Sequence, residues 1–364
     1  MAEQFERKIV LENGAEFYGV GFGAPCSAIN QLAFHTAMAG YQEIISDPSS
    51  TGKMFVMTYP LIGNYGITDD DFESKLPSVG GLVVREYNDS PSNFRWTKTL
   101  SEIMEENNIP GISGIDTRRL TRIIRGEGTQ KVLITDPDTP LDAALEQLRA
   151  YDAPRDLVKR VSCQKKWYSR TANPRFNVAA IDCGIKLGMI KKLNHFGCNV
   201  TIFPYNATAQ EIMELSPDGL FISNGPGSPE DVPEVVALIQ SLRGRLPIFG
   251  ICLGFQLICL AYGAKTYKMK FGHHGVNHPV KELGTGLVEI KGQNHSHAVD
   301  IDSLDGTPLA LTHINLLDNT AEGVECAKDK VVAVQYHPEN TPGPNDEPAT
   351  FEDMMRSVIG FRRA

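Results

Sequence analysis

Residues 246–261 read Leu246-Pro247-Ile248-Phe249-Gly250-Ile251-Cys252-Leu253-Gly254-Phe255-Gln256-Leu257-Ile258-Cys259-Leu260-Ala261. The apolar run before Gly250 is typical of a buried strand, and the amphipathic run after Gly254 is typical of a helix. Between them, Cys252 sits on a sharp turn with a small residue two positions away on either side, as in a nucleophile elbow. The following helix N-terminus favours a thiolate and offers N–H groups to an oxyanion. Most free cysteines are buried core residues, and this is the competing interpretation. The order of strand, turn and helix favours a nucleophile.

The sequence around this turn alternates between strand and helix signals. Buried-type strands are predicted at 178–181, 200–203, 219–222 and 247–249, and helices near 186–196, 231–243 and 253–262. Such alternation predicts an α/β fold with a doubly wound, mostly parallel sheet. Functional sites in such folds gather at the carboxyl ends of the strands.

The N-terminal part has a different pattern of apolar and turn residues, which predicts a separate, mixed α/β domain. Short apolar runs at 8–11, 53–57 and 81–84 are bounded by turn residues, and 116–126 has a helix cap, helical spacing and a Gly stop. Residues 151–174 are polar and basic. We therefore predict an N-terminal domain over 1–150, a connector over 151–174 and a second domain over 175–364.

Composition excludes several classes of protein. The chain has 364 residues and a formal net charge of −9, which suits two domains and argues against nucleic acid or an anionic membrane as the main partner. The polar first eight residues resemble neither a signal peptide nor an anchor, and no uncharged apolar run approaches the ~20 residues of a membrane span. Seven cysteines without paired spacing indicate a reducing compartment, so we expect a cytoplasmic location.

A base and an orienting acid for the thiol are predicted after another strand. The run 330–336 is strongly strand-forming and is followed by His337-Pro338-Glu339. Residues two apart in an extended segment project to the same side, so Glu339 can hold one imidazole nitrogen while the other faces Cys252. A strand-end histidine beside a solvated glutamate is the alternative for an isolated motif of this kind.

A glycine-containing loop, Ser223-Asn224-Gly225-Pro226-Gly227-Ser228-Pro229, follows the strand at 219–222. Glycines let the main chain approach a ligand and direct N–H groups into a site. We assign the two oxyanion donors to the backbone N–H groups of Gly227 and Leu253. The loop matches neither a dinucleotide nor a phosphate-loop motif, so no nucleotide site is predicted in this chain.

Two competing assignments are weaker. Cys183 also follows a strand but lacks a glycine two residues before it, as the elbow requires. The histidines could in principle bind zinc, but their spacing does not repeat a known ligand pattern, and we expect no metal. The histidines in question are His273, His274, His278, His295 and His297.

These motifs together resemble those of class I, triad-type glutamine amidotransferases, through residues 250–256, Asn224-Gly225-Pro226-Gly227 and His337-Pro338-Glu339. Within that class the chain is similar to the small subunit of carbamoyl-phosphate synthetase. The segments that carry this similarity are 268–280, Pro342-Gly343-Pro344, Gly40-Tyr41-Gln42-Glu43-Ile44, Asp47-Pro48-Ser49, 59–64, Ser92-Asn93-Phe94-Arg95 and Asp116-Thr117-Arg118. The resemblance spans nearly the whole chain.

The resemblance implies that the chain hydrolyses L-glutamine to glutamate and ammonia through a Cys252 thioester, with His337 as base and Glu339 orienting it. Ammonia would pass to a large subunit that binds ATP and Mg²⁺ and makes carbamoyl phosphate for pyrimidine and arginine biosynthesis. No cofactor is implied in this chain, and assembly beyond a heterodimer stays open. The glutamine-binding residues implied by position are Ser49, Gly225, Gly227, Leu253, Gln256, Asn294, Ser296 and His297.

The chain departs from the family's usual pattern at a few positions. Ser296 and His297 stand where Gly and Phe are usual, and Phe255 replaces a common His. If position 296 requires a positive φ, Ser296 strains the backbone by about 1 kcal/mol. Two alternative functions are a glutaminase that serves a different ATP-dependent synthetase and a non-catalytic regulatory homologue.

Overall fold

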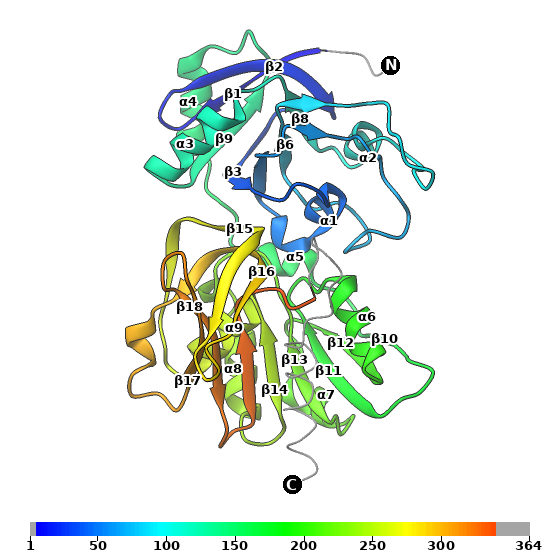
Figure 1. Ribbon diagram of the computed structural model, residues 1–364, viewed down its shortest axis with the longest axis vertical. Coiled ribbons are helices and arrows are strands. Elements are labelled where there is room, and N and C mark those ends of the chain that lie inside the picture. The colour runs from blue at the N-terminus through cyan, green and yellow to red at the C-terminus, as the bar shows by residue number, and fades with distance from the viewer. Residues whose placement is uncertain (1–4, 340–364) are drawn as a thin grey trace. The chain divides into compact units, whose positions relative to one another are not determined.

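The computed structural model describes residues 5–339, which divide into two compact units (Figure 1). Of these residues, 5–154 and 270–275 form the first unit, and 155–269 and 276–339 form the second. No helix in this part of the chain is both long enough and apolar enough to cross a membrane.

The first unit is built on a closed barrel with strand order β1-β2-β8-β6-β4-β3-β9, in which antiparallel and parallel pairs are mixed. Closure leaves the barrel without a free edge. The barrel strands are β1 (Phe5–Leu11), β2 (Glu16–Gly23), β3 (Ala28–His35), β4 (Lys53–Met57), β6 (Gly81–Val83), β8 (Pro110–Ser113) and β9 (Gln130–Thr135). The remaining elements are β5 (Leu61–Ile62) paired with β7 (Glu86–Tyr87), the helices α1 (Tyr41–Ser46), α2 (Leu100–Glu106), α3 (Thr117–Glu127) and α4 (Leu141–Ala150), and the 3-10 turn η1 (Pro48–Ser50).

Apolar side chains on both faces of the barrel strands fill the core of the first unit. Ile9 and Leu11 of β1 pack into one apolar cluster, together with Leu120 of α3. Val10, between them, packs on the other side against α4, where it meets Leu148. A strand places successive side chains on opposite faces, so one strand supplies both contacts.

The second unit contains a ten-stranded sheet with the order β10-β12-β11-β13-β14-β19-β18-β17-β15-β16. The five strands from β12 to β19 in this order are parallel to one another. The strands are β10 (Trp167–Ser169), β11 (Phe176–Asp182), β12 (Cys198–Pro204), β13 (Gly219–Ile222), β14 (Ile248–Ile251), β15 (Thr266–Glu282), β16 (Val288–Val299), β17 (Ala310–Asn315), β18 (Ala321–Cys326) and β19 (Val331–Val334). The helices are α5 (Leu157–Val161), α6 (Leu187–His195), α7 (Ala209–Met213), α8 (Pro233–Leu242) and α9 (Leu253–Ala261), with 3-10 turns η2 (Pro229–Asp231) and η3 (Ile301–Leu304).

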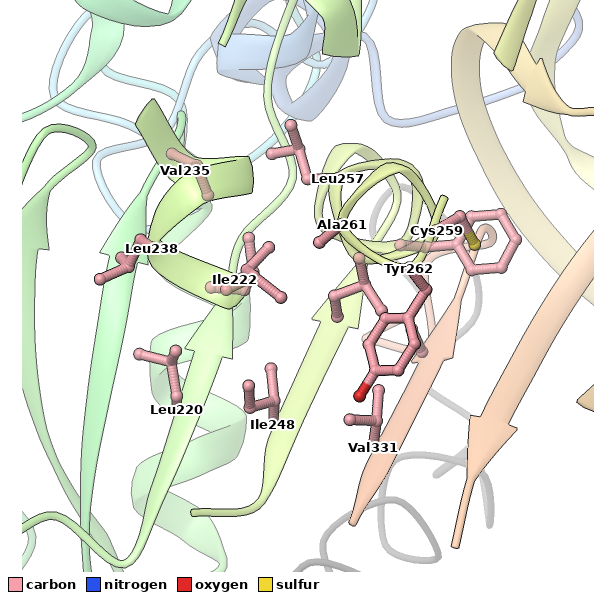
Figure 2. Packing of buried hydrophobic residues seen from close by; sticks show 14 of the residues in the cluster. Leu220, Ile222, Val235, Leu238, Ile248, Leu257, Cys259, Ala261, Tyr262 and Val331 are labelled. Atoms are coloured by element: carbon pink, nitrogen blue, oxygen red, sulfur yellow. The ribbon is translucent and has the colours of Figure 1, made fainter. Parts of the chain in front are cut away.

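Helices cover both faces of the parallel strands. Leu220 and Ile222 of β13 pack with α7, α8 and α9, as Figure 2 shows for α8 and α9. Phe221, between them, points to the opposite face and packs with α6, where Met189 is fully buried. This arrangement confirms the predicted doubly wound, mostly parallel sheet and the separate mixed α/β domain before it.

Two features differ from what the sequence patterns suggest by themselves. The stretch 151–174, which reads as a polar connector, contains α5 and β10, and β10 pairs antiparallel with β12. Beyond β19 the sheet continues through β18 and β17, which are antiparallel to their neighbours. These three strands are short and contain polar residues, so they show little apolar periodicity, and their place in the sheet is set by backbone pairing.

Helix α9 approaches β13 closely at a glycine. A Cβ atom added to Gly254 would lie 2.1 Å from the carbonyl oxygen of Ile222, and one added to Gly250 would lie 2.8 Å from the backbone of Gly254. Both contacts involve backbone atoms, which cannot move aside as a flexible side chain can. The close packing of strand, turn and helix therefore depends on the absence of side chains at these two positions.

We expect Gly254→Ala to destabilise the chain by about 3 kcal/mol, because the new methyl group has no space. This corresponds to a fall in Tm of roughly 5–10 °C for the transition of the second unit, measured by scanning calorimetry. Gly284→Ala is the matched control, since a Cβ there meets nothing within 4 Å. A Tm for Gly254→Ala equal to that of the control would contradict the close approach.

Candidate active site

The carboxyl ends of four parallel strands meet at one edge of the second unit's sheet. In the register of the sheet, Ile222 of β13 lies opposite Ile181 of β11 and Gly250 of β14. Ile251 of β14 in turn lies opposite Val334 of β19. The loops that leave these strands therefore emerge side by side, and most of the polar groups described next lie on them, on α9 or on β16.

Cys252 occupies the sharp turn between β14 and α9. Its φ of 56° and ψ of −106° lie in a region that non-glycine residues rarely adopt, which costs on the order of 1–3 kcal/mol. The turn is fixed by a hydrogen bond from the Cys252 N–H to the carbonyl oxygen of Val334, at 2.9 Å. The thiol is 2% exposed and lies 3.8 Å from the carbonyl oxygen of Asn294.

His337 and Glu339 form a buried pair at the end of β19. The imidazole Nδ1 lies 2.7 Å from Oε1 of Glu339, and the His337 N–H donates to the carbonyl oxygen of Gly292 at 2.9 Å. The other ring nitrogen, Nε2, makes no hydrogen bond within residues 5–339. Burial lowers the pKa of His337, but the Glu339 carboxylate and Cys252 raise it more, to about 10. The pair therefore favours an imidazolium.

Lys186 completes this cluster, and the sequence analysis missed it. Its Nζ lies 2.5 Å from Oε1 of Glu339, and both side chains are 1% exposed. Burial raises the pKa of Glu339, but Lys186 and His337 outweigh it and lower this pKa to about 2. The sequence did contain an indication of this role, because Lys186 follows β11 at the edge of the sheet where the site was expected. Lys186 was instead assigned to the predicted helix near 186–196.

The loop that carries Lys186 is held by a buried carboxylate. Oδ1 of Asp182 accepts hydrogen bonds from the N–H groups of Gly184 and Ile185, both at 2.9 Å, and Oδ2 accepts from the N–H of Cys163 at 2.8 Å. These bonds fix the backbone directly before Lys186. The lysine therefore approaches Glu339 from a rigid loop.

Two other thiols of this unit lie in unsuitable surroundings for a nucleophile. Cys183 is fully buried, and burial together with Asp182 raises its pKa well above the ordinary value. Burial also raises the pKa of Cys259, a residue of α9 that packs in the apolar core (Figure 2). Reactive cysteines need an environment that stabilises the thiolate. Neither residue has one.

The predicted oxyanion residues lie on two elements, Gly227 in the loop after β13 and Leu253 at the start of α9, directly after Cys252. Gly227 has a φ of 89°, and a Cβ on Gly225 would lie 2.1 Å from the carbonyl oxygen of Cys183 and 2.8 Å from the Leu253 side chain. Leu253 is the first residue of α9, where N–H groups have no acceptor inside the helix. Glycine is therefore required in this loop for both conformation and close approach.

Several predicted glutamine-binding residues come together around Gln256. Its Nε2 donates to the carbonyl oxygen of His297 and to Oε1 of Gln335, each at 2.8 Å. Asn294, Ser296 and His297 all lie on β16, and the Asn294 carbonyl faces the thiol. His297 thus contributes a backbone atom to this contact, which any residue could supply.

Position 296 does not have the positive φ on which the expected backbone strain depended. Ser296 lies inside β16, and the non-glycine residues with positive φ among residues 5–339 are Asn108, Ser216, Cys252, Asn319 and Lys330. Phe255 is fully buried in the apolar core of α9. These departures from the usual pattern therefore leave the backbone around Gln256 unstrained.

One predicted glutamine-binding residue belongs to the first unit. Ser49 lies in η1 of the first unit, fully buried, and its N–H donates to Oδ1 of Asp47 at 2.8 Å. The segment Pro342-Gly343-Pro344, which contributed to the resemblance, lies outside the described residues.

Comparison with known proteins agrees with this geometry. Residues 179–357 match the family described as glutamine amidotransferase class-I, and residues 9–134 match the carbamoyl-phosphate synthase small chain, CPSase domain. The chain is 48% identical to the carbamoyl phosphate synthase small chain of Bacillus caldolyticus, over 98% of both chains. It is 48% identical to that of Listeria monocytogenes serotype 4b, over 98% of this chain and 97% of the relative. It is 47% identical to that of Oceanobacillus iheyensis, over 97% and 96%. The chain therefore belongs to the family of carbamoyl phosphate synthase small chains, which here includes a class-I glutamine amidotransferase domain.

Proposed function

We propose that this chain hydrolyses the side-chain amide of L-glutamine and supplies the ammonia to a large, ATP-dependent partner subunit that makes carbamoyl phosphate. The observation that carries the proposal is the elbow thiol of Cys252, close enough to the His337–Glu339 pair to raise the pKa of His337, in a chain that belongs to this family. The product would serve pyrimidine and arginine biosynthesis, and the location would be the cytoplasm. ATP and Mg²⁺ would bind to the partner.

Cys252 acts as the nucleophile. Its thiol proton passes to His337, and the sulfur then attacks the amide carbon of glutamine, while the electron pair of the carbonyl bond moves onto the oxygen. The tetrahedral intermediate collapses as the carbon–nitrogen bond breaks, and the His337 imidazolium protonates the leaving nitrogen, which departs as ammonia. The resulting γ-glutamyl thioester is attacked by water, from which His337 takes a proton. Glutamate leaves, and the thiol is restored.

Glu339 and Lys186 control the charge on the base. The carboxylate orients the imidazole through Nδ1 and stabilises the imidazolium, while Lys186 keeps the buried carboxylate ionised. A buried charge is tolerated only when it is paired, and each charge in this cluster has an opposite neighbour. Cys252 thus faces a group that can hold its proton.

The oxyanion of the tetrahedral intermediate would accept hydrogen bonds from the N–H groups of Gly227 and Leu253. The α9 N-terminus adds a favourable partial positive charge at the same place. The positive φ of Gly227 and the first-turn position of Leu253 support these assignments.

Glutamine would be held by Ser49, Gly225, Gly227, Leu253, Gln256, Asn294, Ser296 and His297. Among these residues, Gln256 has a defined chemical preference. Both protons on its Nε2 are engaged, by the His297 carbonyl and by Gln335 Oε1, so its Oε1 is left to accept. Of the groups of glutamine away from the reacting amide, the α-ammonium is the one that donates.

We expect Cys252→Ala to abolish glutamine-driven synthesis of carbamoyl phosphate by the complex with the large partner, a loss of at least about a thousandfold. Synthesis driven by ammonium should continue, because ammonia does not need the thiol. The measurement is carbamoyl phosphate formed from each nitrogen source. Cys259→Ala is the matched control, a second buried thiol on α9 that should leave both rates close to those of the native chain. Unchanged glutamine turnover in Cys252→Ala would overturn the proposal.

We expect Glu339→Gln to lower the pKa of His337, because burial and Lys186 then act without the opposing carboxylate. In the native chain the raised pKa stabilises the fold below the ordinary histidine value of 6.5, and this contribution is lost as the pH rises towards about 10. Nitrogen NMR of the labelled imidazoles at about pH 8 should show an imidazolium in the native chain and a neutral ring in the variant. The exposed His195 supplies a reference signal. A variant whose His337 remains an imidazolium would contradict the role of Glu339.

A further inference from the structure

Gln335 is a fully buried polar residue that the reaction described above does not use. It follows the last residue of β19 and precedes the base by two positions. Its backbone N–H donates to the carbonyl oxygen of Glu322 at 2.9 Å, which ties this segment to β18. Its side chain reaches Gln256 of α9. Gln335 therefore connects the segment after β19, which carries His337, to α9, which directly follows Cys252.

The hydrogen bonds determine the orientation of the side-chain amides of Gln256 and Gln335. The carbonyl oxygen of His297 can only accept, so the Gln256 atom 2.8 Å away from it must be the Nε2 donor. The Gln335 atom that lies 2.8 Å from this same Nε2 must then be the acceptor, Oε1. With both protons of Nε2 engaged, Gln256 presents its Oε1 as an acceptor, and no group within residues 5–339 donates to that oxygen.

This arrangement leaves the donor end of Gln335 unsatisfied. Its Nε2 is buried and has no hydrogen-bond partner within the described residues. A buried donor without a partner destabilises a fold by about 1–3 kcal/mol. A methionine of similar volume would fill the same space without that cost. Stability of the core therefore does not explain a glutamine here, whereas the acceptor that it offers to Gln256 does.

We propose that Gln335 is a positioning residue that sets specificity for the α-ammonium group of the substrate, by holding the Gln256 amide with its oxygen directed to that group. The inference rests on the proposed glutamine hydrolysis and adds to it the origin of recognition of an amino acid over a simple amide. Without the Gln335 acceptor, one Nε2 proton of Gln256 has no partner. The amide then loses one of the two bonds that fix its orientation.

The test compares glutamine with glutaramate, the analogue that lacks the α-amino group. The complex of the full-length chain with its large partner is assayed for kcat and KM on both substrates, in the native form and as Gln335→Met. The ratio of kcat/KM for glutamine to that for glutaramate should fall by about tenfold in the variant. The ratio should fall because the KM for glutamine rises. The kcat for glutamine and both constants for glutaramate should change little.

Two further variants separate positioning from general damage. Gln335→Glu keeps an acceptor opposite Gln256 and should preserve the ratio of kcat/KM values. This variant also tests the role of Gln335 if Gln335→Met does not fold. Gln293→Met removes another buried amide of this unit, one that donates to Glu322 instead, and should also preserve the ratio.

The outcomes are distinct. An equal loss on both substrates in Gln335→Met, no change on either, or a lowered ratio in Gln335→Glu overturns the role of Gln335. A native complex that hydrolyses neither substrate overturns the proposed function itself.

Discussion

The contact between the start of α9 and the end of β13 fixes the turn on which the site of the second unit is built. At Gly254 the helix backbone approaches the Ile222 carbonyl so closely that no side chain fits between them. This approach brings the first turn of the helix onto the carboxyl edge of the sheet and forces Cys252 into a strained conformation. The apolar packing under α8 and α9 compensates for that strain (Figure 2). The elbow is thus held by the whole core below it.

A chain of alternating charges lies beside the elbow. Lys186, Glu339 and His337 are each almost fully buried, and each contacts the next at 2.5 Å and 2.7 Å. Isolated, any of these charges would strongly destabilise the fold, but together they offset one another. The same arrangement raises the pKa of His337 and lowers that of Glu339. Stability and reactivity therefore have the same electrostatic origin in this cluster.

Around the thiol, main-chain atoms and amides provide most of the polar surface. The carbonyl oxygens of Asn294 and His297 come from β16, and the amides of Gln256 and Gln335 meet between α9 and the end of β19. A site built from backbone atoms tolerates exchange of side chains. This explains how a histidine at position 297 can supply its contact with Gln256 through the carbonyl oxygen alone.

Much of the fold and the outline of the site could be predicted from the sequence. Apolar runs and helical periodicity predicted β11 to β14 and α6, α8 and α9. These patterns could be recognised because they depend only on residues that are near one another along the chain. Cys252, His337 and Glu339 were proposed from strand-end positions and local motifs. The closure of the barrel in the first unit and the places of β10, β17 and β18 could not be predicted, since they depend on pairing between distant segments.

The sequence by itself determined the types of group available: a thiol on a turn between glycines, an imidazole and a carboxylate two residues apart, and glycines in the loop after β13. Only the tertiary structure decided which groups meet. Lys186 and Gln335 lie 153 and four residues before Glu339, and neither forms a motif with it or with Gln256. Their contacts exist because parallel strands bring their carboxyl ends to one edge, and because burial makes each buried charge or amide depend on a specific partner.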